Sequence, residues 1–501
     1  MISITSLSFG INQGTLEIPH KDAHIAFSTL RDQEKPAFLF ESKPTSTIYG
    51  KSSLIGIDPV LRLSGKGDQF QIQVLDSRGE SYFNILTKSE TLLKLCDDFK
   101  KGENKFTGTI YSSKNEMEEG ERSKQKNIAQ VLRQALAQFS MKDSSFLGLY
   151  GAISYDFVRL FEDLDETLQS RGENDFEFFL FDTFIHFDLV KEKTKILVFR
   201  QDKAEIQKTI NTVLKQLEGK PSLSKFKIKD GEFLLSRKEY KNLVKIAKEQ
   251  AEKGEIFEVV FSNVLNAKFS GDSFALYLAY REVNPSPYLF YFNFGQEQLV
   301  GASPEMMVKV ENRIAHLRPI SGTIKRAEDP IQDHENLLKL LTDKKERAEL
   351  DMLIDLGRND LSRVCKPGIR LKEYRSIEKY SKVMHTIAHL TGELKNEYTA
   401  FDALISCLNA GTLTGAPKVA AMRLIEKHEK VRRGFYGGSI GYFTFSGDMD
   451  TAIIIRTAHI KGEDLRFQVG ATLLYRSNPE REYQETLNKA EAFIRLLNPK
   501  L

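Results

Sequence analysis

The sequence has few cysteines, no long apolar run and almost no net charge. Its three cysteines (Cys96, Cys365 and Cys407) lie far apart and show neither metal-ligand spacing nor an even disulfide framework. No apolar run approaches the ~20 residues that a membrane-spanning helix needs. The N-terminus lacks the basic start and apolar core of a signal peptide. We therefore expect a cytoplasmic protein without a membrane partner.

The composition is that of an ordinary soluble globular protein. A net charge of +3 over 501 residues points to neither nucleic acid nor an acidic membrane surface. Hydrophobic residues make up 41% and charged residues 28% of the chain. The length suggests about three units of roughly 150 residues each. Nucleic-acid binding is therefore not expected.

The chain shows short strands and helices that alternate irregularly. The regular strand–helix rhythm of a parallel, doubly wound fold is missing. A polar stretch at 219–232 is the best linker candidate, and Ser236 and Glu239 beyond it fit a capping box at a helix start. We predict an α+β fold divided into 1–225 and 226–501.

Seven glycines cluster between residues 408 and 457. Clustered glycines indicate backbone that adopts positive φ or approaches a ligand closely. Tight packing between strands would explain them equally well. The segment is not a nucleotide loop, because Ala416 and Pro417 separate Gly415 from the lysine. The side chains in this stretch that could hold a small polyanion are Thr412, Thr414, Lys418, Tyr442 and Arg456.

Two predicted helices each place a pair of glutamates on one face. Glu346 and Glu349 are three residues apart, and Glu482 and Glu485 repeat this spacing near the C-terminus, where Ser477 suits the helix cap. Carboxylates from two helices could hold Mg²⁺. Glutamates are also common on solvated helix surfaces, so the spacing alone leaves both interpretations open.

Two histidines, His385 and His389, lie four residues apart without the glutamate of a zinc-protease motif. A histidine suits proton transfer because its pKa lies near working pH. A structural role is the common alternative for an isolated histidine.

Several blocks resemble the anthranilate synthase component I family of chorismate-utilising enzymes, most closely its enterobacterial type. They are A-G-T-L-T-G-A-P-K, R-R-G-F-Y-G-G-S-I-G-Y and D-T-A-I-I-I-R. The resemblance implies two intertwined β-rich subdomains, with antiparallel sheets packed face to face and helices outside. It also implies that 1–225 is a regulatory, tryptophan-binding region and that 226–501 is the chorismate-binding catalytic region.

The resemblance implies three catalytic residues. His385 matches the general acid–base histidine of the family, and Thr323 lies in a block that resembles R-P-x-x-G-T. Glu258 stands where the family has a glutamine near the attacking nucleophile, and Thr472 stands where it has a glycine. Ser321 replaces the nucleophilic lysine of many aminodeoxychorismate synthases.

The resemblance also implies the ligand contacts. Mg²⁺ would be bound directly by Glu349 and Glu485, with Glu346 and Glu482 as outer partners. The implied substrate-binding residues are Gly322, Thr323, Thr412, Tyr442, Arg456, Gly470, Ala471, Thr472 and Lys489.

A regulatory site is implied by F-L-F-E-S and N-P-S-P-Y-L, which resemble the family's feedback elements. Glu41 would accept the ammonium group of tryptophan, although strand packing alone would also explain these apolar segments. The implied tryptophan-binding residues are Glu41, Ser42, Lys51, Ser53, Pro287, Tyr288 and Leu289.

The implied activity is conversion of chorismate and ammonia to anthranilate and pyruvate in tryptophan biosynthesis, with feedback inhibition by tryptophan. No cysteine lies in the setting of a glutaminase nucleophile, so a separate glutamine amidotransferase subunit would supply ammonia, in a heterotetramer with two of each subunit. The alternatives are a related aminodeoxychorismate or 2-amino-2-deoxyisochorismate synthase, and a catalytically inactive regulatory paralogue.

Overall fold

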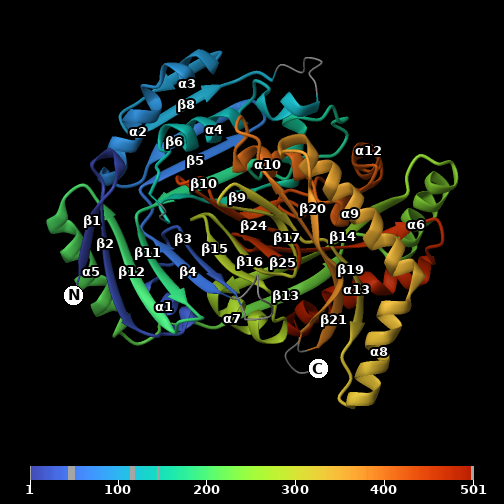
Figure 1. The fold of residues 1–501 in the computed structure, drawn as a ribbon. Coiled ribbons are helices and arrows are strands. Elements are labelled where there is room, and N and C mark those ends of the chain that lie inside the picture. Colours follow the sequence, from blue (N-terminus) through green and yellow to red (C-terminus); the bar gives the residue numbers. More distant parts are fainter. Residues whose placement is uncertain (1, 43–50, 113–118, 144–145, 381, 498–501) are drawn as a thin grey trace.

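Two large antiparallel sheets form the frame of the molecule (Figure 1). The computed structural model describes residues 2–42, 51–112, 119–143, 146–380 and 382–497. The first sheet has the spatial order β1 (Ser3–Ser6), β2 (Asn12–Pro19), β12 (Lys193–Arg200), β11 (Thr183–Asp188), β4 (Ser52–Ile57), β3 (Ala37–Glu41), β15 (Tyr288–Asn293), β16 (Glu297–Ser303), β25 (Thr457–Lys461), β26 (Asp464–Leu474), β14 (Glu258–Gly271) and β13 (Phe226–Phe233), with β22 (Gly415–Ala416) beside β14.

The second sheet is built in the same way. Its spatial order is β19 (Ile320–Lys325), β21 (Val383–Glu393), β18 (Ile314–Leu317), β17 (Met306–Glu311), β24 (Met449–Ile453), β23 (Ser439–Thr444), β9 (Gly148–Ile153), β10 (Phe176–Phe181), β5 (Leu61–Lys66), β6 (Gln69–Val74), β8 (Lys105–Thr109) and β7 (Asp98–Lys101), with β20 (Arg370–Lys379) beside β21. The predicted α+β class with antiparallel sheets is confirmed.

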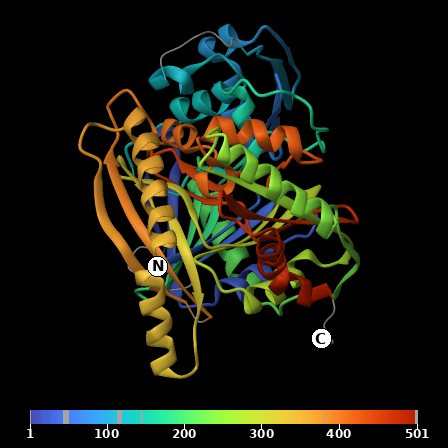
Figure 2. The same cartoon turned by 90° about the vertical axis from the view of Figure 1, so that its right-hand side faces the viewer.

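Helices cover the outer faces of the sheets. The α-helices are α1 (Ala23–Leu30), α2 (Glu80–Thr87), α3 (Glu90–Leu95), α4 (Ala129–Gln138), α5 (Lys203–Leu217), α6 (Arg237–Glu252), α7 (Ser273–Val283), α8 (Pro330–Thr342), α9 (Lys344–Val364), α10 (Ala400–Cys407), α11 (Gly411–Thr414), α12 (Lys418–His428) and α13 (Pro479–Leu497). Short 3-10 turns occupy Ser8–Gly10, Ser77–Gly79, Glu119–Lys124 and Tyr155–Leu160. Figure 2 shows α8 and α9 along one side of the molecule, over β19 to β21.

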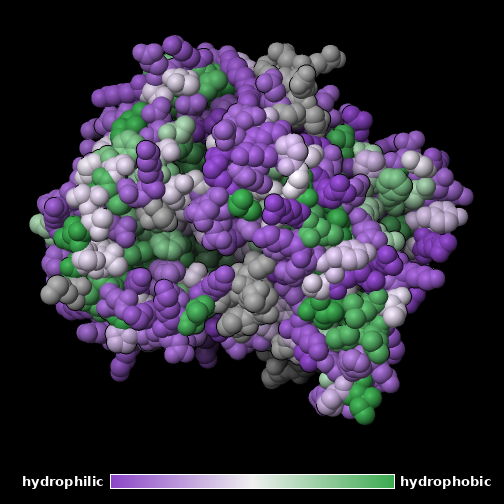
Figure 3. All heavy atoms as spheres, in the orientation of Figure 1, coloured by the Kyte–Doolittle hydropathy of each residue, from purple (hydrophilic) through white to green (hydrophobic). Residues whose placement is uncertain are grey.

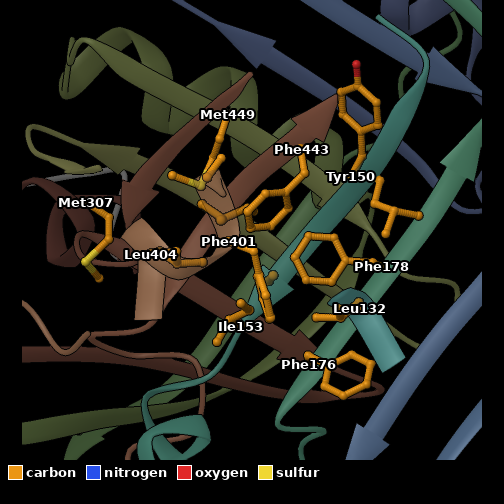
Figure 4. Packing of buried hydrophobic residues seen from close by; sticks show 14 of the residues in the cluster. Leu132, Tyr150, Ile153, Phe176, Phe178, Met307, Phe401, Leu404, Phe443 and Met449 are labelled. Atoms are coloured by element: carbon orange, nitrogen blue, oxygen red, sulfur yellow. The ribbon is translucent and has the colours of Figure 1, made fainter. Parts of the chain in front are cut away.

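The main core lies between the two sheets. Phe38 of β3 stacks on Tyr150 of β9, with ring centroids 4.8 Å apart. Figure 4 shows that Phe178 and Phe443 of the second sheet pack with Phe401 of α10 on the opposite face of the sheet from Tyr150. Buried aromatic rings contribute much of the apolar area that holds two sheets together. A second core lies outside the first sheet, beneath α1, α5, α7 and α13.

Each sheet combines strands from both sides of the predicted boundary, arranged as two contiguous blocks. The blocks meet where β3 pairs with β15 in the first sheet and where β9 pairs with β23 in the second. Within the predicted linker, 226–233 forms β13, which pairs with β14. The linker prediction therefore fails for its second half, because pairing with a neighbouring strand orders a polar segment that has little apolar pattern of its own.

The surface is mostly polar, with an apolar area over α8 at the lower right of Figure 3. Ile331 and Leu338 of α8 are 71% and 47% exposed. In the part of the chain that the structure describes, no helix has the length and apolar character needed to cross a membrane.

Candidate active site

Two capped helices carry the predicted glutamate pairs. α9 begins directly after Asp343, whose side chain accepts hydrogen bonds from first-turn amides. α13 begins directly after Asn478, whose Oδ1 accepts from two first-turn amides. The prediction of Ser477 as the cap is wrong by one residue, because the asparagine next to the helix takes that role. Ser477 Oγ instead accepts from the amide of Leu474 at 3.0 Å.

The glutamates lie close enough to influence one another. Burial, together with the charges of Glu346 and Glu485, raises the pKa of Glu349 to about 7. Burial also raises the pKa values of Glu346 and Glu482, with smaller contributions from the charge of Asp343 at Glu346 and from that of Glu485 at both. Lys489 Nζ lies 2.8 Å from Glu485 Oε1. The two helices thus bring both pairs to one place, with one lysine beside them.

This group of carboxylates fits a hard divalent cation in charge and in donor type. Burial and, to a smaller extent, mutual repulsion raise the pKa values of these carboxyls, and a cation would relieve the repulsion. Within the described ranges, no three histidine, cysteine or acidic side chains are arranged to hold a metal ion by themselves. Mg²⁺ commonly uses one or two carboxylates, several waters and oxygen atoms of the substrate. The site therefore suits an ion that the substrate helps to hold.

A histidine–threonine pair lies across two neighbouring strands. Thr323 of β19 is opposite His385 of β21. Thr323 Oγ1 lies 2.8 Å from His385 Nδ1, and the Gly322 carbonyl lies 3.3 Å from the same nitrogen. Since a carbonyl oxygen only accepts, Nδ1 carries the hydrogen and Nε2 is left as the base. Burial, with a smaller effect of the Arg456 charge, lowers the pKa of His385 to about 4, so the imidazole is neutral at pH 7.

Gly322, whose φ is 78°, connects the histidine–threonine pair with the glutamate pairs. A Cβ added at this residue would lie 3.0 Å from Glu346 Oε2. Glycine is therefore suited here both by its conformation and by the close approach. Ser321 beside it is buried and donates to the Glu346 carbonyl at 3.3 Å.

A buried carboxyl that the sequence analysis missed faces the same region. Thr412 Oγ1 lies 3.1 Å from both carboxyl oxygens of Glu305. Burial raises the pKa of Glu305 to about 8, against the opposing effects of Thr412 and Lys489. Glu305 therefore carries a proton at pH 7 and can act as an acid.

The paired strands β14 and β26 form one wall. Val260 pairs with Thr472 and Ser262 with Gly470, so alternate residues, including Glu258, share one face. Burial, with a smaller effect of Glu349, raises the pKa of Glu258 to about 8.

The predicted substrate-binding residues Gly470, Ala471 and Thr472 lie on this wall, in β26. Lys489 Nζ donates to the Gly470 carbonyl at 2.9 Å. Ala471 has its side chain fully buried in the apolar cluster beneath α6 and α12, on the opposite face from Gly470. Ala471 can therefore contribute only its backbone to a ligand on the Gly470 side, whereas the half-buried side chain of Thr472 lies on that side.

The tyrosine beside Gly470 is Tyr436 and not Tyr442. A Cβ added at Gly470 would lie 2.9 Å from Tyr436 Oη. The charge of Arg456 contributes a lowering effect to the pKa values of both Tyr436 and His385, so its guanidinium lies near both side chains. Arg456 itself has a positive φ of 50°. Tyr442 instead stacks on Tyr150, with centroids 5.3 Å apart, and lines a different cavity. The prediction that grouped Tyr442 with Arg456 chose the wrong tyrosine of the same glycine-rich block.

Other polar residues of the motifs have structural partners. Lys418 Nζ lies 2.7 Å from Asp360 Oδ2 and donates to the Cys407 carbonyl at 3.1 Å. Thr414 is fully buried. His389 Nε2 lies 3.1 Å from Nδ1 of His316. Lys418 and His389 are therefore held by contacts within the protein, and these contacts account for their presence without a ligand.

The profile of the chorismate binding enzyme family matches residues 94–495. The chain belongs to the chorismate binding enzyme family. It is similar to anthranilate synthase component 1 of Methanothermobacter thermautotrophicus, at 32% identity over 480 residues that cover 96% of this chain and 93% of that protein. It is also similar to anthranilate synthase component 1 of Acetivibrio thermocellus, at 38% identity over 369 residues that cover 70% of this chain and 75% of that protein.

Solved structures agree with this membership. Anthranilate synthase component I from Streptococcus pneumoniae matches with a TM-score of 0.69 at 29% identity, covering 95% of this chain and 98% of that one. The menaquinone-specific isochorismate synthase from Escherichia coli matches with a TM-score of 0.69 at 18% identity, covering 99% and 96%, and shows the shared fold.

Apart from the active-site region, this chorismate binding enzyme has a cavity of about 100 Å³ between its sheets. Four of the residues predicted to bind tryptophan line it, together with Tyr442 and Asp450. They are Glu41, Ser42, Tyr288 and Leu289. Tyr288 Oη donates to Asp450 Oδ1 at 2.9 Å. Burial raises the pKa of Asp450, a carboxyl that the sequence analysis also missed.

The feedback element meets the Pro287 segment beside this cavity. Ser42 Oγ donates to the Pro287 carbonyl at 2.7 Å, and the Ser42 amide donates to Ser53 Oγ at 3.4 Å. Lys51 is exposed. Residues 43–50, between the two serines, lie outside the described residues.

Glu41, the predicted ammonium acceptor, already has partners. Its Oε2 accepts from Arg281 Nε at 2.9 Å and from Tyr277 Oη at 2.5 Å. Burial opposes ionisation, but His24, Arg281 and Tyr277 hold the pKa of Glu41 below its usual range. Asp450 therefore stands as a second acidic group at the cavity.

The sequence gives only weak signals for the two active-site residues that were not predicted, Glu305 and Tyr436. Glu305 is an acid between two apolar strand segments, and Tyr436 stands inside the quoted block R-R-G-F-Y-G-G. Neither spacing nor periodicity shows which of two tyrosines, six positions apart, points to the glycine wall.

Proposed function

We propose that this chain is an anthranilate synthase component 1, which converts chorismate and ammonia to anthranilate and pyruvate in tryptophan biosynthesis. The observation that carries the proposal is the similarity to anthranilate synthase component 1 chains along almost the whole length. The convergence of the glutamate pairs, His385, Arg456 and Lys489 in one region supports it.

Glu349 and Glu485 would hold Mg²⁺, with Glu346 and Glu482 behind them. The ion would offset the charge of the substrate's ring carboxylate where this meets the protein's own carboxylates. Lys489 and the backbone of Gly470 would bind that same carboxylate.

The second carboxylate of chorismate would meet Arg456, whose guanidinium can pair bidentately with a carboxylate. Tyr436, which adjoins Gly470, is suited to donate a hydrogen bond to the same group. Tyr442 has no part in this step.

Two groups divide the proton transfers. Ammonia attacks C2 of chorismate and its nitrogen then gives up one proton to water, while Glu305, protonated at pH 7, gives its proton to the C4 hydroxyl as this leaves as water. His385 is neutral and therefore serves as a base: its Nε2 removes the C2 proton, the ring becomes aromatic and the C3–O bond breaks. The enolpyruvate that leaves takes up a proton at its methylene carbon and becomes pyruvate. In this proposal His385 acts as the base, whereas the family resemblance implies a general acid–base role for it.

The ammonia would come from a separate glutamine amidotransferase subunit, as the name component 1 of the relatives implies. We extend the proposal to a heterotetramer with two subunits of each kind and to feedback inhibition by tryptophan at the cavity between the sheets.

One incubation tests the function. The isolated chain, with chorismate, Mg²⁺ and high ammonium, is expected to form anthranilate, identified by mass and by its fluorescence. The chain contains no tryptophan, so protein emission does not obscure the product. Accumulation of an aminated cyclohexadiene that keeps the enolpyruvyl group, with a mass close to that of chorismate, would indicate the 2-amino-2-deoxyisochorismate alternative. Binding without turnover would indicate an inactive paralogue.

The aminodeoxychorismate alternative is separated by the product. Ser321 is buried and bonded to the backbone of α9, and a serine cannot form the amine adduct that a lysine forms. Formation of a 4-amino product by the isolated chain would overturn the proposal.

A further inference from the structure

A buried arginine lies behind the wall that carries Gly470. Arg433 is 3% exposed, and its guanidinium makes four hydrogen bonds within the protein. Two of them go to Glu429: Nε donates to Oε2 at 3.1 Å and Nη2 donates to Oε1 at 2.6 Å. A bidentate pair of this kind fixes the plane of the guanidinium as well as its position.

The other two hydrogen bonds of this arginine reach two walls of the active site. Nη2 donates to the Val260 carbonyl of β14 at 2.6 Å, and Val260 pairs with Thr472 of β26. Nη1 donates to the Leu413 carbonyl of α11 at 2.6 Å. Leu413 directly follows Thr412, whose hydroxyl contacts Glu305. One guanidinium therefore joins the wall of β14 and β26 to the turn that holds the acid.

Glu429 extends the same connection along the wall. Its Oε1 accepts from the Ser262 amide at 2.9 Å and from the Ser262 hydroxyl at 2.7 Å. Ser262 pairs with Gly470, and its hydroxyl accepts from Gln468 Nε2 at 2.7 Å. A buried network whose members are all hydrogen-bonded is rigid. The ion pair thus holds both strands at the position of Gly470.

The guanidinium also packs against Tyr436. The Arg433 Cζ lies 5.6 Å from the centre of the Tyr436 ring and 4.7 Å from that of the Tyr155 ring. A cation within about 6 Å of an aromatic face is attracted by the ring. Tyr436 Oη is the atom beside Gly470, so the arginine contributes to the placement of this hydroxyl.

A lysine could not make this set of contacts. Its donors are all on one nitrogen, whereas the acceptors around Arg433 lie on three separate segments and match a planar fork. The arginine is enclosed by protein, so it can affect the reaction only through the groups that it holds.

We propose that Arg433 is a positioning residue that sets the distance between the proton donor Glu305 and the carboxylate-binding hydroxyl of Tyr436. The inference rests on the proposed function, which assigns Glu305 to the C4 hydroxyl and Tyr436 to the second carboxylate of chorismate. That carboxylate belongs to the substituent on C3, the ring carbon next to C4. The separation of the two protein groups must therefore match one substrate.

Arg433→Lys tests the inference, because it keeps the charge and removes the fork. We expect KM for chorismate to rise and kcat to fall by about ten-fold each, since a misplacement of about 1 Å can cost about 10²-fold. The alkaline limb of the kcat/KM profile should also move to higher pH. Burial raises the pKa of Glu305 and the Thr412 hydroxyl lowers it, and the second effect weakens when Leu413 is released.

Arg31→Lys is the matched control. Arg31 is also buried, donates to Asp272 through Nη1 at 2.8 Å and lies over the Phe274 ring at 4.9 Å from its centre. This pair adjoins the second core, outside the first sheet. Arg31→Lys is expected to lower the melting temperature to a similar extent, while KM and kcat stay within about two-fold and the alkaline limb does not move.

A folded Arg433→Lys with unchanged KM and an unmoved alkaline limb overturns the inference, as does the same kinetic change in Arg31→Lys. If Arg433→Lys does not fold, Ser262→Ala is measured instead, because it removes one hydrogen bond to Glu429. It should raise KM by about two- to five-fold, and an unchanged KM would count against the network.

The proposed function fails separately, if the unaltered chain forms no anthranilate with saturating ammonium. Calorimetry with chorismate then decides the inference. Arg433→Lys must bind chorismate about ten-fold more weakly than the unaltered chain, and equal affinity overturns the positioning role.

Discussion

Burial moves the pKa values of Glu305 and His385 in opposite directions. Glu305 is raised to about 8 and His385 is lowered to about 4. Between these values one group is a protonated acid and the other a neutral base, which is the pairing that the proposed reaction requires at neutral pH.

Replacing Glu305 with glutamine should remove the acid. We expect kcat to fall by about 10²-fold or more, because general acid catalysis contributes 10²–10⁴-fold. In the unaltered chain, kcat/KM should fall as the pH rises through about 8, since Glu305 then loses its proton. A pH profile of both proteins checks this. An unchanged alkaline limb in Glu305→Gln would show that another group controls it.

The same raised pKa has a consequence for stability. A carboxyl with a folded pKa above its unfolded value contributes stability at low pH that is lost as the pH rises through the folded pKa. Glu305→Gln should therefore be more stable relative to the unaltered chain at pH 9 than at pH 5, as measured by urea unfolding at both values.

His385→Asn should block the second step more than the first. The asparagine cannot remove the C2 proton, so the aminated intermediate is expected to accumulate while anthranilate formation falls by about 10²–10⁴-fold. Mass spectrometry of the mixture shows the intermediate directly. Thr323→Val, which removes one contact to Nδ1, is the graded control and should cost less. An equal loss of intermediate and anthranilate would contradict the assignment.

Individual side chains were predictable where a motif fixes them and ambiguous where a motif offers two. Thr323 and His385 occupy opposed positions on β19 and β21, and their pairing follows from the sheet register. Tyr436 and Tyr442 stand in one block, but Tyr442 lies in β23 and faces the cavity between the sheets. That distinction depends on tertiary packing, which the sequence does not show.

The helices α9 and α13 act together through their carboxylates. Glu349→Gln should raise the Mg²⁺ concentration needed for half-maximal activity by about ten-fold or more, because a directly bound carboxylate is lost. The control is Glu491→Gln, on α13, where the glutamate pairs with Arg495 away from the cluster. A Mg²⁺ titration of activity separates the two variants.

Without metal, Glu349→Gln should stabilise the protein, although it weakens Mg²⁺-dependent activity. Glu349 has its pKa raised to about 7, so ionising it above that pH costs folding free energy. With a chelator at pH 8, Glu349→Gln should melt at a higher temperature than the unaltered chain. A lower melting temperature together with unchanged Mg²⁺ dependence would count against the metal site.

Elements with their own apolar pattern or cap were predicted, and polar edge segments were not. The capping box of Ser236 and Glu239 marks α6, and both side chains bond as expected. The segment 105–109, which shows little apolar pattern, forms β8 between β6 and β7. Such a strand is ordered by its neighbours, so its own residues give little signal.

The whole molecule places both proposed sites where the two sheets meet. The cavity with Tyr288 and Leu289 from the first sheet is closed by Tyr442 and Asp450 from the second. The active site likewise joins β14 and β26 of one sheet to β19 and β21 of the other. We therefore expect a ligand that changes the spacing of the sheets at one site to affect the other.

This arrangement predicts reciprocal coupling between tryptophan and chorismate. If tryptophan weakens chorismate binding by some factor, chorismate must weaken tryptophan binding by the same factor, because both act on one equilibrium.

Ser42→Ala removes the hydroxyl that donates to the Pro287 carbonyl, so tryptophan should bind about ten-fold more weakly, while uninhibited kcat stays within about two-fold. Ser273→Ala, whose hydroxyl contacts Tyr291 outside the cavity, is the control. Because the chain has no tryptophan of its own, the ligand's emission reports binding directly, with and without chorismate. Equal tryptophan affinity in both conditions would show that the two sites are independent, and the shared frame of the sheets would then not transmit the inhibition.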